Sequence, residues 1–144
     1  MVINGLMQTN FTIFTDGAYS FTRDQGGIAF IIFKDNKSIF EYSKTYKGTT
    51  NNRMEMLACI VALESIQDPN DIILVSDSQY VVKTYTDNWK RKKNNDLWER
   101  FDKAIKRHKS VKFEWTKGHA DNRINNRCDQ LAVEASQKEV DYEK

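Results

Sequence analysis

Apolar residues in the first third of the chain follow the spacing of β-strands. Phe11–Thr15 is rich in aromatic and β-branched residues and runs into Asp16-Gly17, a pair typical of turns. Ile28–Phe33 is a continuous apolar run, as expected of a strand covered on both faces. In Ser38–Tyr46 aromatic residues alternate with polar ones, which predicts a strand with one solvated face. We expect these three strands to form an antiparallel meander.

From Asn52 onward the spacing of apolar residues changes to that of helices. A broad apolar face extends from there to Asp68-Pro69, where the predicted helix ends. Ile72–Val75 is the most hydrophobic strand candidate, and it stops abruptly at Asp77. The remaining pattern predicts a helix at Tyr80-Val81, a helix over Leu97–His108, a strand over Val111–Trp115 and a helix over Cys128–Ala135. Strands interleaved with helices after a meander predict a mixed sheet flanked by helices.

Composition limits what this α/β architecture can contain. With 144 residues, 40% of them hydrophobic, the chain is long enough for one domain with a real core and too short for two ordinary ones. We therefore expect a single domain over residues 1–144, with frayed ends at 1–10 and 138–144. The formal net charge is only +2, so attraction to a polyanion must come from local basic patches.

Cysteine usage and hydropathy predict the compartment. Cys59 and Cys128 lie within helical patterns and form no framework of spaced pairs, which suits free thiols in a reducing compartment. The first ten residues lack the pattern of a signal peptide, and no stretch approaches the ~18 apolar residues of a membrane-spanning helix. We expect a soluble, cytoplasmic protein with no membrane partner.

Four carboxylates lie next to a predicted turn or helix start: Asp16, Glu55, Asp77 and Asp129. Three of them follow apolar runs that should lie in the interior, where an unpaired negative charge is costly. If the strands that end at Asp16 and Asp77 are parallel neighbours, both side chains emerge at the same edge of the sheet. Glu55 and Asp129, each near a helix start, could complete an oxygen-lined site for Mg²⁺ or Mn²⁺.

Each of these acids also has a purely structural interpretation. An aspartate before glycine is common in turns, and Asp77-Ser78 could cap a helix. Glu55 could complement a helix dipole, and Asp129 could be a surface residue. These explanations do not account for acids that border the apolar stripes of two helices and end two buried strands. The four residues together favour a shared site.

The sequences around the four acids resemble those of type 1 ribonuclease H. The matching segments are TDG around Asp16, TTNNRME over Thr49–Glu55, DSQY over Asp77–Tyr80, KGHA over Lys117–Ala120 and RCDQL over Arg127–Leu131. The resemblance extends from about Phe11 to the last helix, and the motifs follow the order of the predicted elements. It implies the ribonuclease H-like fold, a five-stranded mixed sheet with helices on both faces.

The resemblance also implies an activity, namely endonucleolytic hydrolysis of the RNA strand of an RNA–DNA hybrid that leaves 5′-phosphate and 3′-hydroxyl ends. The four acids would bind two Mg²⁺ ions, or Mn²⁺, and two such ions ~3.5–4 Å apart can activate a water and stabilise the leaving 3′-oxygen. His119, in KGHA, is implied as an accessory catalytic residue that assists proton transfer or product departure. It could alternatively be a loop histidine with a structural hydrogen bond. We expect a monomer with the hybrid as its partner.

Recognition of a hybrid depends on the 2′-hydroxyl, which distinguishes RNA from DNA. The resemblance assigns Asn51, Asn52 and Gln79 to contacts in or beside the minor groove, and amide side chains suit this role because they both donate and accept hydrogen bonds. The asparagines could instead cap the following helix.

A basic run lies between Trp89 and Trp98, and we expect its four cations to engage phosphates: Lys90, Arg91, Lys92 and Lys93. It could instead be only a solvated loop. The run is shorter than the basic handle of longer family members. Thr22 also stands where many relatives have an asparagine that contacts the minor groove, so the first loop is expected to hold substrate differently.

Two other functions fit parts of the pattern. Transposase and integrase catalytic domains share the fold and the acidic cluster, but they do not require NNRME together with DSQY. A non-catalytic hybrid-binding module would be expected to lack at least one of the four acids, and all four are present.

Overall fold

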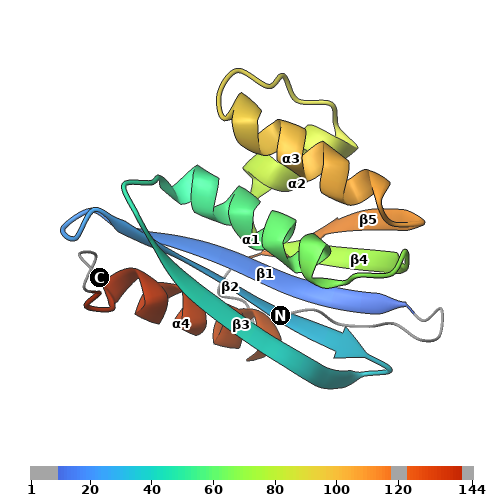
Figure 1. The fold of residues 1–144 in the computed structure, drawn as a ribbon, viewed down its shortest axis with the longest axis horizontal. Coiled ribbons are helices and arrows are strands. Elements are labelled where there is room, and N and C mark those ends of the chain that lie inside the picture. The colour runs from blue at the N-terminus through green and yellow to red at the C-terminus, as the bar shows by residue number, and fades with distance from the viewer. Residues whose placement is uncertain (1–9, 118–122, 141–144) are drawn as a thin grey trace.

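The structure is a computed structural model that describes residues 10–117 and 123–140. Its centre is a five-stranded sheet with the strand order β3-β2-β1-β4-β5 (Figure 1). The strands are β1 (Phe11–Ser20), β2 (Gln25–Lys34), β3 (Lys37–Lys47), β4 (Asp71–Ser76) and β5 (Ser110–Trp115). The helices are α1 (Asn51–Ser65), α2 (Gln79–Thr86), α3 (Asn95–Lys106) and α4 (Arg123–Gln137).

The first three strands form the antiparallel meander that the apolar pattern predicts. β1 pairs with β2 along its whole length, from Phe11 opposite Lys34 to Ser20 opposite Gln25. β2 and β3 are joined through Asp35 and Asn36, which both have positive φ, at 51° and 62°. Aspartate and asparagine tolerate this left-handed conformation better than most residues, and it matches the twist of a two-residue hairpin turn.

The other two strands run parallel to β1. β4 pairs with β1 from Phe11 opposite Ile72 to Phe14 opposite Val75, and β5 pairs with the far side of β4. Beyond Phe14, β1 continues beside β2 only. The prediction that Asp16 follows the end of its strand is therefore wrong, because pairing with β2 extends β1 to Ser20. Asp16 instead lies just past the point where β1 loses its parallel neighbour.

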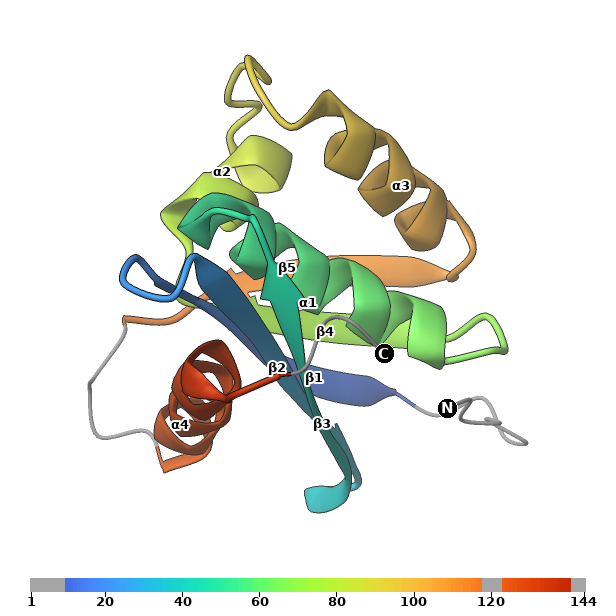
Figure 2. The ribbon, with the colours of Figure 1, turned by 60° about the vertical axis from the view of Figure 1, so that its left-hand side comes forward.

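Helices cover both faces of the sheet, as the resemblance implies. α1 packs on β1 and β2, α3 packs on α1, and α4 lies on the opposite face against β1, β2 and β3. Figure 1 shows α1, α2 and α3 above the sheet and α4 below it, and Figure 2 shows the same separation from the side. The larger part of the core lies between α1, α3 and the sheet, with Trp98, Phe101 and Ile13 among its buried side chains. A smaller cluster lies under α4.

Glycines allow two helices to lie directly on the sheet. A Cβ atom on Gly17 would come within 3.0 Å of backbone atoms of Met54 and Glu55 in α1. One on Gly27 would come equally close to the carbonyl oxygen of Ala132 in α4. The acids of α1 and α4 therefore approach the central strands as closely as the backbone permits. Within the described ranges, no helix combines the length and the hydropathy needed to cross a membrane.

Candidate active site

Three of the four expected acids meet at one place. Asp16 on β1, Glu55 on α1 and Asp77 after β4 each offer a carboxylate oxygen, and these oxygens lie within 4.8 Å of one another. Asp16 is 2% exposed and Glu55 is 7% exposed, while Asp77 is partly buried. The parallel pairing of β1 with β4 brings the two aspartates to the same edge, as the sequence predicts.

The carboxylate of Asp77 does not cap the helix that follows it. The Ser78 hydroxyl caps α2, because it accepts a hydrogen bond from the backbone N–H of Val81 at 3.2 Å. The expected cap at Asp77-Ser78 is therefore present, but Ser78 provides it and the Asp77 side chain does not. The indole N–H of Trp115, at the end of β5, donates to the carbonyl oxygen of Asp77 at 3.1 Å and ties this turn to the next strand.

Gly17 connects two of the acids through its backbone. Its N–H donates to the Asp16 carboxylate at 2.9 Å and to the Glu55 carboxylate at 2.6 Å. The side chain of Glu55 thus reaches from α1 to the backbone of β1. The sequence did not reveal this role, since the Asp16-Gly17 pair resembled an ordinary turn.

Asp129 lies beside this group but belongs to the other face of the sheet. It is partly buried within α4, and its charge acts on Asp16 to raise the pKa of that residue. The preceding Cys128 is fully buried, with its thiol 3.5 Å from the carbonyl oxygen of Phe14 and 3.4 Å from that of Ala29. α4 is therefore held against β1 and β2 where Asp129 projects.

Burial and mutual repulsion raise the pKa of the two most enclosed acids. Burial, followed by the charge of Asp77, raises the pKa of Asp16 to about 8. The pKa of Glu55 is raised well above its usual value by burial and by the charges of Asp16 and Asp77. Both shifts therefore come from burial and from neighbouring negative charges.

The donor set fits a hard divalent cation. One carboxylate oxygen of Asp16 and one of Asp77 are buried without a hydrogen-bond partner among residues 10–117 and 123–140. The carboxylate oxygens that converge from Asp16, Glu55 and Asp77 are the kind of ligand that Mg²⁺ and Mn²⁺ prefer. A bound cation would compensate the charge that raises both pKa values.

The amides expected to contact substrate lie at the first turns of two helices. Asn51 and Asn52 begin α1, Gln79 begins α2, and all three are exposed. Thr50 caps α1, with its hydroxyl accepting from the backbone N–H of Arg53 at 3.2 Å. The alternative in which the two asparagines serve to cap this helix is therefore wrong.

The four cations of the basic run differ in their surroundings. Lys90, Lys92 and Lys93 are exposed, and within the described residues none of them pairs with a carboxylate. Arg91 instead forms a 2.6 Å ion pair with Asp102 on α3. Sequence reasoning missed this partner because Asp102 belongs to a later helix.

Two further expectations concern loops. His119 lies outside the described residues, as do residues 1–9 and 141–144 of the expected frayed ends. Its accessory role stays a prediction from the sequence. Thr22 is exposed in the turn between β1 and β2, and its hydroxyl lies 3.3 Å from that of Ser20.

Known proteins resemble the chain over nearly its whole length. The family model described as RNase H matches residues 8–137. A protein named Ribonuclease H from Serratia proteamaculans is 45% identical over 138 residues, covering 86% of this chain and 87% of that protein. A second, from Trichodesmium erythraeum, is 43% identical over 145 residues and covers 91% of each chain.

Solved structures show the same fold at lower identity. The N-terminal RNase H domain of a Mycobacterium tuberculosis protein superposes with a TM-score of 0.79 at 20% identity, covering 90% of this chain and 94% of that one. LC9-RNase H1, described as a type 1 RNase H with the type 2 active-site motif, superposes with a TM-score of 0.77 at 22% identity, covering 92% and 74%. The fold and the enzyme class expected from the sequence are thereby confirmed, and the chain belongs to the ribonuclease H family.

Proposed function

We propose that the protein hydrolyses the RNA strand of RNA–DNA hybrids with two bound divalent cations. The observation that carries this proposal is the convergence of Asp16, Glu55 and Asp77, whose carboxylate oxygens lie within 4.8 Å of one another. One buried oxygen of Asp16 and one of Asp77 have no hydrogen-bond partner in the part of the chain that the structure describes. The names of the relatives support the substrate, and Mg²⁺ is the cation we favour for an all-oxygen site.

The acids hold the reaction centre, and the exposed amides hold the hybrid. Asp16, Glu55, Asp77 and Asp129 would bind the cations, which when bound supply an activated water and stabilise the departing 3′-oxygen, so that the products carry 5′-phosphate and 3′-hydroxyl ends. Because Gly17 holds the Glu55 carboxylate on β1, the acids from α1 and β1 keep a fixed relative position.

Substrate selection falls to the first turns of α1 and α2. Asn51, Asn52 and Gln79 can each donate to and accept from sugar and base edges, including the 2′-hydroxyl that marks the RNA strand. Lys90, Lys92 and Lys93 supply a sequence-independent attraction to phosphates.

We further propose a monomeric, cytoplasmic enzyme. The three clustered carboxylates all come from one copy of the chain, so no second copy is needed to assemble them. Cys59 and Cys128 are both free thiols, as is usual in a reducing compartment.

The direct test is cleavage of labelled RNA–DNA hybrid, double-stranded DNA and double-stranded RNA, each with Mg²⁺ or a chelator. We expect only the RNA of the hybrid to be cut, and only with the metal. Asp77→Asn should lower the rate at least about 100-fold, because it replaces a ligand of the metal site.

Asp71→Asn is the matched control for this substitution. It makes the same chemical change at the other end of β4, where Asp71 accepts a hydrogen bond from the Ser110 hydroxyl at 2.7 Å. We expect this variant to cut at the parental rate. Cleavage of double-stranded DNA in place of the hybrid, or full activity of Asp77→Asn, would contradict the proposal.

A further inference from the structure

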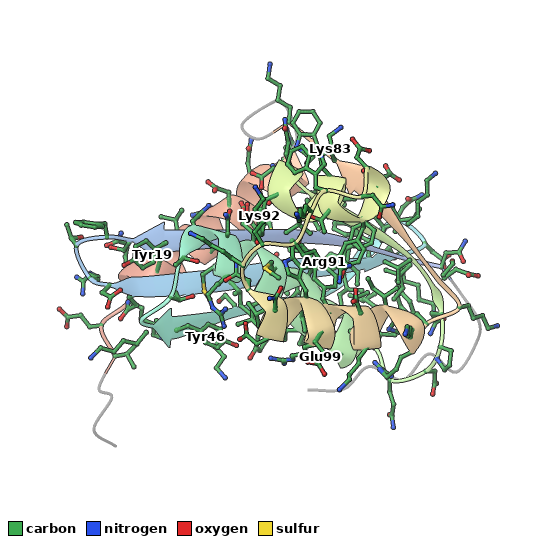
Figure 3. All side chains as sticks on the ribbon, turned by 90° about the horizontal axis from the view of Figure 1, so that it is seen from above. Tyr19, Tyr46, Lys83, Arg91, Lys92 and Glu99 are labelled. Carbon is green, nitrogen blue, oxygen red and sulfur yellow. The ribbon has the colours of Figure 1, made fainter. Side chains whose placement is uncertain are left out.

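Arg91 is exposed like the lysines beside it, but unlike them it has a carboxylate partner among the described residues. Its guanidinium makes two hydrogen bonds to the Asp102 carboxylate, at 2.6 Å and 3.0 Å. The same group lies 5.2 Å from the ring centre of Tyr85 and 5.1 Å from that of Trp98. Figure 3 labels Arg91 and its neighbour Lys92 on the loop between α2 and α3. A bidentate pair that also lies over aromatic rings has a fixed geometry.

The partners of Arg91 belong to the rigid part of the molecule. The Tyr85 hydroxyl donates to Asp102 at 2.8 Å, so the carboxylate is held from two sides. The hydrogen bonds from Arg91 are the main reason that the pKa of Asp102 is lowered. Tyr85 and Trp98 both pack against Phe101, whose side chain is fully buried. Arg91 therefore attaches the loop to the aromatic core under α3.

A second attachment holds the end of the same loop. Asn94 adopts the left-handed conformation, with φ of 63°. Its side chain accepts from Arg53 at 3.1 Å and donates to the Tyr80 hydroxyl at 3.0 Å. Arg53 and Tyr80 belong to the same first turns of α1 and α2 that carry the exposed amides. The loop is thus fixed with respect to the residues proposed to contact the hybrid.

Only Lys92 and Lys93 lie between these two attachments. Three residue steps from Arg91 to Asn94 span at most about 11 Å when fully extended, so the two lysines have little freedom to move away. Cations held in place before binding lose less conformational entropy when they meet phosphates. This matters most in a short loop that has no helix of its own to hold it.

We infer that Arg91 is a positioning residue, which through Asp102 holds the loop so that Lys90, Lys92 and Lys93 meet the phosphates of the bound hybrid. The inference rests on the proposed function and assigns the basic run two separate tasks. The lysines supply charge to the substrate, and Arg91 fixes where that charge lies.

Asp102→Asn tests this division, because it removes a negative charge without touching any cation. If Arg91 contacted phosphates itself, the substitution would release it and tighten binding. If the Arg91–Asp102 pair positions the loop, breaking it should weaken binding. We expect the Kd for a fluorescent hybrid, measured by anisotropy in chelator, to rise by about threefold to tenfold. KM should rise by a similar factor while kcat stays unchanged, since the acids are not affected.

The salt dependence of binding gives an independent readout. Lysines that no longer meet phosphates release fewer counterions, so the slope of log Kd against log salt should fall by about one to two in Asp102→Asn. Arg91→Lys keeps the charge but loses the planar bidentate pair, and we expect it to match Arg91→Ala. The double variant Arg91→Ala/Asp102→Asn should bind no more weakly than either single variant.

Glu64→Gln is the matched control. Glu64 forms the same bidentate pair with Arg100, at 2.8 Å and 2.6 Å, and joins α1 to the same helix α3. The Kd of this variant should stay within about twofold of the parent, because neither Glu64 nor Arg100 belongs to the loop between α2 and α3. Circular dichroism tests whether each variant is folded. If Asp102→Asn or Arg91→Ala does not fold, the comparison is made with Arg91→Lys.

The outcomes separate the inference from the proposed function. A parent protein that neither binds nor cuts the hybrid would overturn the proposed function. A parent that binds while Asp102→Asn binds equally or more tightly, or while Arg91→Lys binds like the parent, would overturn the positioning role and leave the proposed function standing.

Discussion

Asp16 carries an electrostatic cost that the rest of its site does not offset. It is 2% exposed, and burial together with the charge of Asp77 raises its pKa from 3.8 to about 8. The folded protein without metal therefore holds a proton between about pH 4 and pH 8 that the unfolded chain releases. Since the folded state binds more protons in this range, the stability of the metal-free protein falls as pH rises from about 4 to about 8.

Asp16→Asn should remove this dependence. We expect the variant to be more stable than the parent by about 1–3 kcal/mol at pH 8, and the difference to shrink towards zero at about pH 4. Urea unfolding in chelator at the two pH values measures it. Asp71→Asn, which makes the same change at an exposed acid on β4, is the control. An equal difference at both pH values would exclude the buried charge as the cause.

At the scale of elements, local spacing predicted the type and order of the helices and strands, and pairing decided their ends. β1 is longer than its apolar run because Gly17–Ser20 pair with β2, which hydrophobicity alone does not reveal. The convergence of Asp16 with Asp77 was predictable, because both border apolar strands that became parallel neighbours.

Contacts that span long distances along the chain were beyond prediction. Gly17 N–H binds Glu55 from 38 residues away, and Arg53 reaches Asp96 across 43 residues. Arg91 looked like a phosphate contact in the sequence because nothing nearby marks Asp102 as its partner. Such roles depend on which helices pack together, and short motifs do not encode this.

Gly17→Ala tests how α1 is seated on β1. The new Cβ would press on the backbone of Met54 and Glu55, which cannot yield as a flexible side chain would. We expect a loss of about 2 kcal/mol or more in stability and at least about 100-fold in cleavage rate, because a small displacement of Glu55 disturbs the site.

Gly48→Ala is the comparison for this substitution. Gly48 has φ of 62°, and no atom lies within 4 Å of the position of an added Cβ. The substitution therefore costs only the strain of placing alanine in a left-handed backbone conformation. We expect a loss of about 1 kcal/mol in stability and an unchanged cleavage rate. If both variants lost activity equally, the close approach of α1 would not be the cause.

In the whole molecule, the two ends of the sheet respond to pH in opposite ways. At the end away from the acids, His108 is buried, accepts a hydrogen bond from the N–H of Asn70 at 3.3 Å and bonds the carbonyl oxygen of Leu63 at 2.9 Å. Burial is the main cause that lowers the pKa of His108. It joins the end of α1 to the start of β4 in its neutral form.

His108→Gln should be less stable than the parent by about 1–2 kcal/mol at pH 7.5, through loss of these hydrogen bonds. As the pH falls, His108 takes up a proton more readily in the unfolded chain than in the folded protein. The contribution of His108 to stability is therefore full above about pH 6.5 and declines below it. The difference between the two proteins should therefore narrow at pH 5.5 in urea unfolding. A difference that widens on acidification would contradict this, and cleavage at saturating hybrid should be unaffected.

The ten-residue pairing between β1 and β2 also determines on which face of the sheet the Asp16 side chain lies. Side chains alternate along β1, so Phe11 and Ile13 enter the core under α1, while Asp16 shares its face with Ala18, on the side of α4. A shift of one residue in this hairpin would exchange the two faces, placing Asp16 among apolar side chains and exposing them in turn. Mispaired chains would thus lose both the core and the cluster of Asp16 with Glu55 and Asp77. Correct packing of the core under α1 and correct placement of Asp16 therefore depend on the same strand register.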